Sequence, residues 1–257
     1  STVSQIRQMS ANPNAIAQEK FNELAYGKGN VFAKAAIGTI DSVNGITLDD
    51  LKAYYEKNLS PSVARMHVVG DIGKSKVTAS LKGLNSNWKK KDVKLPSFTL
   101  PAAPSRAQIY FYDVPNASQS VLRIGYPALK ETDADFYPAT VANYILGGGG
   151  FASRLTQELR EGKGYTYGIN SNFSGSSNSG LFTIGSGVRS NVTLESLQLV
   201  KSILEAYPKT FSDQDLETTK GFLVKSNARA FETSNAKLGM LDKISSYGWK
   251  TDYVKSR

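Results

Sequence analysis

Hydrophobic positions in the N-terminal part of the chain predict helices and one strand. A first helix is indicated by apolar residues at helical spacing: Ala15, Ile16, Phe21 and Leu24. A second helix is predicted to begin at Thr47–Asp50, and a third to cover residues 74–84. Between them, Val63–Val69 is β-branched and apolar enough for a buried strand, and it ends at Gly70 and Asp71. This order is typical of an α/β domain.

In the C-terminal part of the chain, the spacing of hydrophobic residues changes repeatedly between that of a strand and that of a helix. Strands are predicted at Ala107–Val114 and Ser118–Tyr126, paired across the turn at residues 115–117. A helix follows at 133–146, and helical spacing resumes at 151–160. A second hairpin is predicted at 165–173 and 181–188, joined by a loop at 174–180, with helices at 193–207, 212–230 and 234–247. We therefore expect an α+β fold with antiparallel sheets packed against helices.

A segment near the middle of the chain is predicted to separate two domains. The stretch KKKDVKLPSFTLPAAPSR, which ends at Arg106, contains three prolines and has no periodicity. We expect residues 1–92 to form the C-terminal part of an incomplete first α/β domain. Residues 93–106 would be the linker, and residues 107–257 a second α+β domain.

Composition excludes several classes of site. The 257 residues contain no cysteine and a single histidine, His67, so neither a thiolate nor a multi-histidine zinc site can form from them. A serine triad would need that one histidine, and no G-x-S-x-G elbow is present. The net charge is +9, but the dense run Lys89–Lys91 has no interleaved aromatic residues, so nucleic-acid binding is not predicted. No apolar run reaches the roughly eighteen residues of a membrane span.

Four consecutive glycines, Gly147–Gly150, interrupt the helical pattern. They fail as a phosphate-binding loop because Phe151, Ala152 and Ser153 follow them instead of Lys-Ser or Lys-Thr. Two interpretations stay open. The glycines either break the helix and allow tight packing, or form a loop that lines a peptide cleft.

The segment GGGGFASRLTQELREGKGYTY, residues 147–167, resembles the insulinase/pitrilysin family of zinc metallopeptidases. In that family a Gly-rich turn, a Ser-Arg-Leu helix, an Arg-Glu pair and a Gly-x-x-Tyr strand start occur in this order. Upstream, Ala36–Ile72 is similar to the family's Gly-Thr loop, helix and Val-Val-Gly-Asp strand. The resemblance implies one half of a clamshell built from two tandem related domains.

The resemblance implies catalytic roles for Arg160 and Tyr167, which lie seven residues apart. Arg160 would hold a substrate carbonyl and Tyr167 would donate a hydrogen bond to the developing oxyanion. Gly148, Gly149 and Phe151 would contact the substrate. The structural alternatives are a surface ion pair of Arg160 with Glu161 or Glu158, and a half-buried strand aromatic for Tyr167. Tyr165, two residues earlier, competes for the tyrosine role.

Zinc is expected in a partner half, because H-x-x-E-H is absent from these residues and Gln5 stands where the family's third ligand is expected. That half, from the same polypeptide or a separate subunit, would enclose a peptide with this chain. We therefore predict the substrate-binding, non-zinc half of a zinc endopeptidase that is inactive alone. The alternative is an inactive scaffold member of the family, as occurs in respiratory complexes. The family alone points to a bacterial periplasm or cell envelope, and the sequence leaves the location open.

Overall fold

The computed structural model describes residues 1–102 and 104–255, and by its contacts the chain divides into two compact units. The first unit contains residues 1–43 and 98–223, and the second contains residues 44–97 and 224–257. Ala103, in the predicted linker, and residues 256–257, at the end of the predicted second domain, lie outside the described residues. The units follow contacts and not sequence order, so the division into 1–92, 93–106 and 107–257 stays a prediction.

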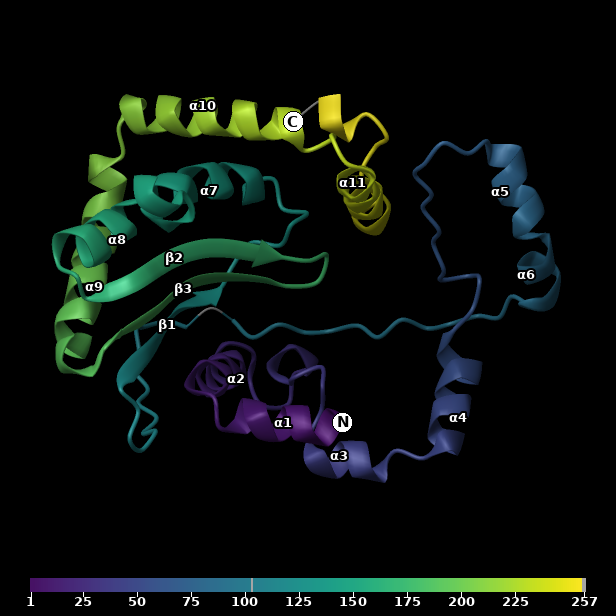
Figure 1. Ribbon diagram of the computed structural model, residues 1–257, viewed down its shortest axis with the longest axis horizontal. Coiled ribbons are helices and arrows are strands. Elements are labelled where there is room, and N and C mark those ends of the chain that lie inside the picture. The colour runs from purple at the N-terminus through teal and green to yellow at the C-terminus, as the bar shows by residue number, and fades with distance from the viewer. Residues whose placement is uncertain (103, 256–257) are drawn as a thin grey trace. The chain divides into compact units, whose positions relative to one another are not determined.

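The first unit is built on a three-stranded antiparallel sheet with the order β1-β3-β2 (Figure 1). The strands are β1 (Gln119–Pro127), β2 (Thr166–Gly175) and β3 (Gly180–Arg189). Gly185 of β3 lies between Arg123 of β1 and Asn170 of β2. Because side chains alternate between the faces of a strand, this row lies on the face opposite to Ile184.

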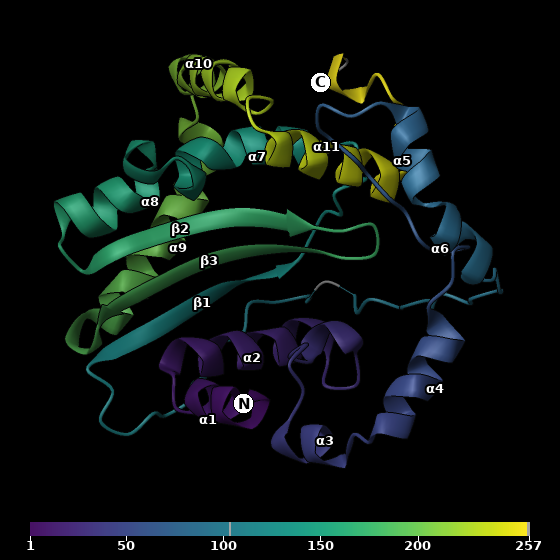
Figure 2. The same ribbon diagram turned by 45° about the vertical axis from the view of Figure 1, so that its right-hand side comes forward.

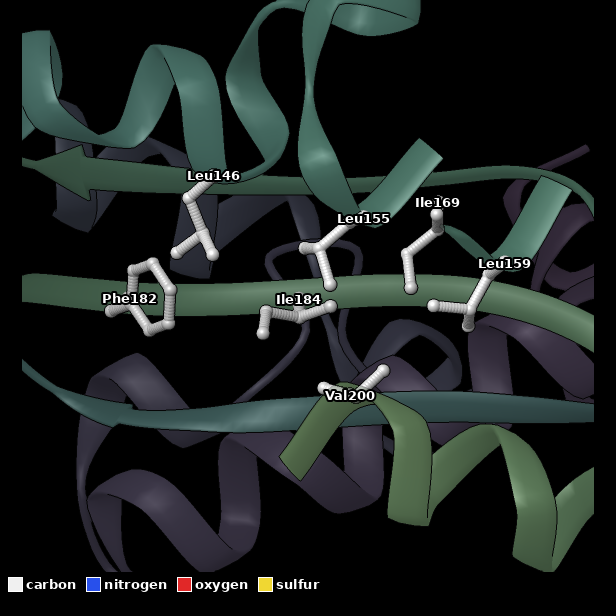
Figure 3. Close-up of a cluster of buried hydrophobic side chains, with 7 residues drawn as sticks. All are labelled: Leu146, Leu155, Leu159, Ile169, Phe182, Ile184 and Val200. Atoms are coloured by element: carbon white, nitrogen blue, oxygen red, sulfur yellow. The ribbon is translucent and has the colours of Figure 1, made fainter. Parts of the chain in front are cut away.

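Helices cover the face of the sheet that carries Ile184. They are α7 (Phe136–Asn143), the π-helix η2 (Tyr144–Gly148), α8 (Arg154–Thr156), the π-helix η4 (Gln157–Gly162) and α9 (Thr193–Thr210). The 3₁₀ turns η3 (Gly150–Ala152) and η5 (Ser190–Val192) precede α8 and α9. Figure 3 shows the buried side chains that meet here: Leu146, Leu155, Leu159, Ile169, Phe182, Ile184 and Val200. Burial of side chains of this size stabilises the fold by about 1.5–3 kcal/mol each, so this cluster is the main core of the unit.

The opposite face of the sheet is covered in part by the N-terminal helices. Figures 1 and 2 show α2 (Pro13–Tyr26) beside β1; the 3₁₀ turn η1 (Val31–Ala33) follows α2, and α1 (Thr2–Ser10) packs on α2. Leu181 packs there with Tyr26 and Ala33 in a smaller buried cluster. Gly125 permits the close approach, since a Cβ at that position would lie 2.0 Å from the Phe182 carbonyl oxygen and 3.0 Å from the Phe21 ring.

Helix α8 is tied to the start of α10 (Asp213–Arg229) by an arginine. The Arg154 guanidinium donates to the Asp215 carboxylate at 2.6 Å and to the Thr210 carbonyl at 2.6 Å, and it lies 4.9 Å from the centre of the Tyr207 ring. Burial raises the pKa of Tyr207 to about 12, and the Tyr207 hydroxyl donates to the Ala142 carbonyl at 2.5 Å. The Arg154 side chain therefore has a structural role.

The second unit is mostly helical. It contains α4 (Leu48–Asn58), α5 (Lys74–Ser80), α6 (Lys82–Asn87), α11 (Ser234–Tyr247) and the 3₁₀ turn η6 (Tyr253–Lys255), while α3 (Ile40–Gly45) and α10 cross the division between the units. Thr47 and Asp50 form a reciprocal capping box at the start of α4. Ser60 is buried because its hydroxyl donates to the Lys91 carbonyl at 2.8 Å and accepts from the Lys91 amide at 3.0 Å.

Most of the predicted helices and the predicted second hairpin are present in the structure, but two predicted strands are wrong. Val63–Val69 and Ala107–Val114 form no ladder with any described residue, so the predicted pairing of 107–114 with 118–126 is also wrong. Ile109 is 88% exposed and Phe111 is 87% exposed. Their composition suits a strand, but a strand also needs neighbouring backbone groups, and the described residues offer none.

Loss of the Arg154 contacts should destabilise the protein. We expect Arg154→Ala to lower the free energy of unfolding by about 2 kcal/mol, because it leaves the Asp215 carboxylate without its charged partner. Chemical denaturation measures this change. Arg229→Ala is the control, since Arg229 faces Glu232 at 3.9 Å on the surface and should cost less than about 0.5 kcal/mol. Equal costs for the two variants would contradict the structural role of Arg154.

The same contacts predict a dependence of stability on pH. The Ser212 backbone amide, followed by the Ser212 hydroxyl and Arg154, holds the pKa of Asp215 below its ordinary value. This contribution to stability is fully present above the unfolded-state pKa of about 3.9 and is lost as the pH falls through the lower folded-state pKa. As the pH falls from 6, the free energy of unfolding should therefore decrease less steeply in Asp215→Asn than in the unsubstituted chain. Parallel pH profiles for the two proteins would contradict this assignment.

Candidate functional site

The Gly-rich segment lies directly on β2. Gly147 is buried against Ser171, and a Cβ at Gly147 would lie 2.3 Å from the Ser171 hydroxyl oxygen. The Asn143 amide donates to the Ser171 carbonyl at 2.8 Å and accepts from the Ser171 hydroxyl at 2.6 Å. These buried hydrogen bonds and the missing side chain fix the end of the first π-helix on the strand.

The other glycines meet different requirements. A Cβ at Gly148 would lie 2.9 Å from the Asn143 amide nitrogen, and one at Gly149 would lie 2.7 Å from the Tyr144 carbonyl oxygen. Gly150 has a φ of +56°, which favours glycine for its backbone conformation. The segment thus breaks the helix and packs tightly, which is the first of the two interpretations drawn from sequence. Only Gly150 of the four reaches the hollow described next.

A hollow of about 350 Å³ opens between the Gly-rich turn, the second π-helix and β2. Its lining residues are Gly150, Phe151, Thr156, Arg160, Gly168, Ile169 and Asn170. Phe151 is 60% exposed, and the Arg160 guanidinium lies 4.6 Å from the centre of its ring. Arg160 Nε also forms an ion pair with Glu161 at 3.3 Å, which is the structural alternative considered above. Among the described residues, its terminal nitrogens Nη1 and Nη2 make no hydrogen bond.

Arg160 lies within η4, a π-helix of six residues. A π-helical turn inserts a residue into the helical repeat and so changes the direction of the side chains that follow, and such turns are frequent at functional sites. Leu159, the preceding residue, is fully buried in the main core. The core therefore holds the backbone beside Arg160, while the guanidinium stays accessible.

Tyr167 protrudes from a β-bulge in β2. Thr166 pairs with Val188 and Ile169 pairs with Ser186, so the ladder shifts register over Tyr167 and Gly168. Tyr167 is 87% exposed, so it is not the half-buried strand aromatic that was considered as its structural alternative. Bulges of this kind redirect a side chain and are over-represented beside active sites.

Two buried hydroxyl groups hold the bulge. The Thr166 hydroxyl donates to the Gly187 carbonyl at 2.7 Å and accepts from the Gly168 amide at 3.0 Å. The Ser186 hydroxyl donates to Thr166 Oγ1 at 2.9 Å and can also reach the Gly168 carbonyl at 3.0 Å. Thr166 and Ser186 therefore position Tyr167, a role that the sequence analysis missed. Gly168 within a strand pattern was the available signal, because an isolated glycine there indicates a bulge.

The predicted site residues are only partly brought together. Arg160 and Phe151 line one hollow, and Gly168, the neighbour of Tyr167, lines it too. Tyr165 is half-buried, and its backbone is engaged because its amide donates to the Leu159 carbonyl at 2.9 Å and its carbonyl accepts from the Arg189 amide at 3.2 Å. Gly148 and Gly149 pack against residues 143–144 and do not line the hollow. The arrangement offers a guanidinium and a phenol as hydrogen-bond donors, but no nucleophile paired with a base.

A zinc site does not fit these residues. Within residues 1–102 and 104–255, no group of three His, Cys, Asp or Glu side chains lies close enough to hold a metal ion. His67 has one acidic neighbour, Asp242, with Nδ1 3.9 Å from Oδ1. The part of the chain that the structure describes also has no helix long and apolar enough to cross a membrane.

Comparison with known proteins identifies the fold. The family model described as the Peptidase M16 inactive domain matches residues 45–223. A crystal structure of a peptidase M16 inactive domain from Pseudomonas fluorescens superposes with a TM-score of 0.89 at 27% identity, covering 99% of this chain and 60% of that one. The mixed α+β fold predicted from sequence is therefore confirmed.

Curated relatives carry differing descriptions. An uncharacterized zinc protease of Streptomyces coelicolor is 25% identical over 90% of this chain and 51% of its own length. A non-peptidase homolog of Helicobacter pylori is 31% identical over 80% of this chain and 47% of its own length. The chain thus spans about half the length of these relatives. The matched family model covers most of the chain, and the chain belongs to the M16 peptidase family as a member of its inactive-domain group.

Proposed function

We propose that this chain is the substrate-binding, non-zinc half of a zinc endopeptidase, in which Arg160 and Tyr167 stabilise the scissile amide. The observation that carries the proposal is the combination of an accessible guanidinium at the hollow with an 87% exposed phenol on a bulge beside it. Neither side chain is needed for the core. The zinc, which would activate water, belongs in this proposal to a partner half, since the described residues of this chain do not fit it.

The separate roles proposed for Arg160 and Tyr167 follow from the chemistry of their donor groups. A guanidinium can hold a carbonyl oxygen of a bound peptide, and a phenol can donate a hydrogen bond to the same region as negative charge develops on oxygen. Phe151 keeps the Arg160 guanidinium plane in place by stacking, with 4.6 Å between the guanidinium carbon and the ring centre. The exposed ion pair with Glu161 is worth at most about 1 kcal/mol, so a substrate carbonyl can compete for the guanidinium.

Removal of one hydroxyl tests the role of Tyr167. This chain alone should bind no stoichiometric zinc and hydrolyse no peptide, whereas the assembly with its zinc-bearing half should be active. In that assembly, Tyr167→Phe should lower kcat by roughly a hundred- to a thousandfold, the usual effect of losing one oxyanion donor. Tyr165→Phe is the matched control and should retain turnover. Unchanged kcat in Tyr167→Phe would rule out the proposed role.

The buried hydroxyls under the bulge should affect turnover without contacting substrate. Thr166→Val removes the hydrogen bonds to Gly168 and Gly187, so we expect a fall in kcat of about tenfold with little change in KM. Thr166→Ser keeps the hydroxyl and should restore turnover. Thermal unfolding of both variants, followed in parallel, separates loss of positioning from loss of fold. A Thr166→Ser variant as slow as Thr166→Val would argue against positioning through the hydroxyl.

A scaffold without peptidase activity is the second candidate, and the Helicobacter pylori relative described as a non-peptidase homolog favours it. The two candidates differ in what the full-length protein requires. An H-x-x-E-H segment in the parent reading frame or in an adjacent one supports the peptidase half. If no such segment exists and no added M16 partner restores hydrolysis, the scaffold is the better assignment.

A further inference from the structure

A second hollow, of about 320 Å³, lies on the face of the sheet that carries α2. Strand residues form its floor and α2 contributes one wall through Asn14 and Gln18. Its other lining residues are Arg123, Asn170, Asn172, Thr183, Gly185, Ser186 and Gly187. None of these is a carboxylate and Arg123 is the one charged side chain in this set, so the hollow is a polar site with a single positive charge.

Arg123 has no acidic partner among the described residues, in contrast to Arg154 and Arg160. Its guanidinium donates only to neutral oxygens: Gln18 Oε1 at 3.2 Å, the Leu122 carbonyl at 3.0 Å and Asn14 Oδ1 at 3.4 Å. Burial lowers the pKa of Arg123, and no carboxylate offsets that effect. A guanidinium has five N–H groups, and three are used, so Nη1 and Nη2 each retain one free donor.

Gly185 makes room for the guanidinium. A Cβ at Gly185 would lie 3.1 Å from Arg123 Nη1 and 3.9 Å from Asn170 Oδ1. Because Gly185 pairs with Arg123 on one side and with Asn170 on the other, the arginine lies along a row across the sheet. The Cα atoms of Arg123 and Asn170 are therefore about 10 Å apart, two interstrand spacings.

Two of the amides that line the hollow retain donors. Asn14 and Gln18 use their carbonyl oxygens to accept from Arg123, and Asn172 uses its oxygen to accept from the Thr183 hydroxyl at 2.7 Å. Engagement of the oxygens of Asn14 and Asn172 leaves their NH₂ groups to donate. A half-buried cation that keeps two free N–H groups, with amide NH₂ groups nearby, favours an anionic ligand over a neutral or cationic one.

We propose that this hollow is a subsite for a carboxylate group of the bound peptide, either an acidic side chain or the C-terminus. Asn170 lines both this hollow and the one beside Arg160, so a single extended peptide can reach both. The single guanidinium balances the single charge of a carboxylate, whereas a phosphate dianion would keep one uncompensated charge in this half-buried site. That the carboxylate belongs to a peptide rests on the proposed function. That the hollow binds a carboxylate does not depend on it.

The probes are a matched pair, N-acetyl-glutamate N-methylamide and the corresponding glutamine derivative, titrated separately into the full chain. Binding is followed by NMR from the side-chain NH₂ signals of Asn14 and Asn172. We expect the glutamate probe to bind at least about tenfold more tightly than the glutamine probe. Arg123→Gln should abolish this preference. Gly185→Ala keeps the charge but displaces the guanidinium, and should weaken binding of the glutamate probe several-fold.

Arg189→Gln removes an exposed arginine of the same sheet and serves as the charge control, so it should leave the preference unchanged. Equal affinities of the two probes for the unsubstituted chain, or a preference that survives in folded Arg123→Gln, would overturn the inference. Tighter binding of inorganic phosphate than of the glutamate probe at this site would overturn the carboxylate assignment. These measurements need no zinc-bearing half, so their failure is distinguishable from failure of the Tyr167→Phe test.

Discussion

The absence of a side chain at Gly147 determines how the helical layer sits on the sheet. Since a Cβ there would be 2.3 Å from the Ser171 hydroxyl oxygen, the turn can lie against β2 only as glycine. Asn143 completes this contact with two buried hydrogen bonds, and Leu155 and Leu159 pack in the core between the helices and the sheet. The position of Arg160 relative to β2 depends on that packing, because Arg160 directly follows a fully buried leucine.

Three arginines of the first unit illustrate how surroundings decide the role of one residue type. Arg154 is paired with Asp215 and stacked on Tyr207, so its charge is used within the fold. Arg160 has only an exposed partner and a stacking surface, which leaves its terminal nitrogens accessible. Arg123 is half-buried among neutral oxygens. Arg154 is therefore committed to the fold, whereas Arg160 and Arg123 both keep guanidinium N–H groups that can bind an external oxygen.

The sequence predicts elements well where local periodicity is sufficient. The helices at 13–26, 48–58 and 193–210, and the hairpin of β2 and β3, follow from apolar spacing and a Gly/Ser-rich loop. Val63–Val69 and Ala107–Val114 have the composition of strands, but pairing is a property of neighbours that local composition does not contain. The roles proposed for Arg160 and Tyr167 came from family spacing. The bulge at Tyr167 and the Arg123 hollow arise from register and from contacts across 100 or more residues, as between Gln18 and Arg123, and local patterns cannot predict them.

The exposed segment at residues 107–114 has a consequence for the chain as a solute. Ile109–Tyr112 joins four large apolar or aromatic side chains with open backbone donors and acceptors and contains no proline, which is the composition of segments that pair between molecules. Arg106 and Asp113 border this stretch and act as gatekeeper charges. Association of this stretch between molecules is thereby opposed by two charges that take no part in the core or in the chemistry of the chain.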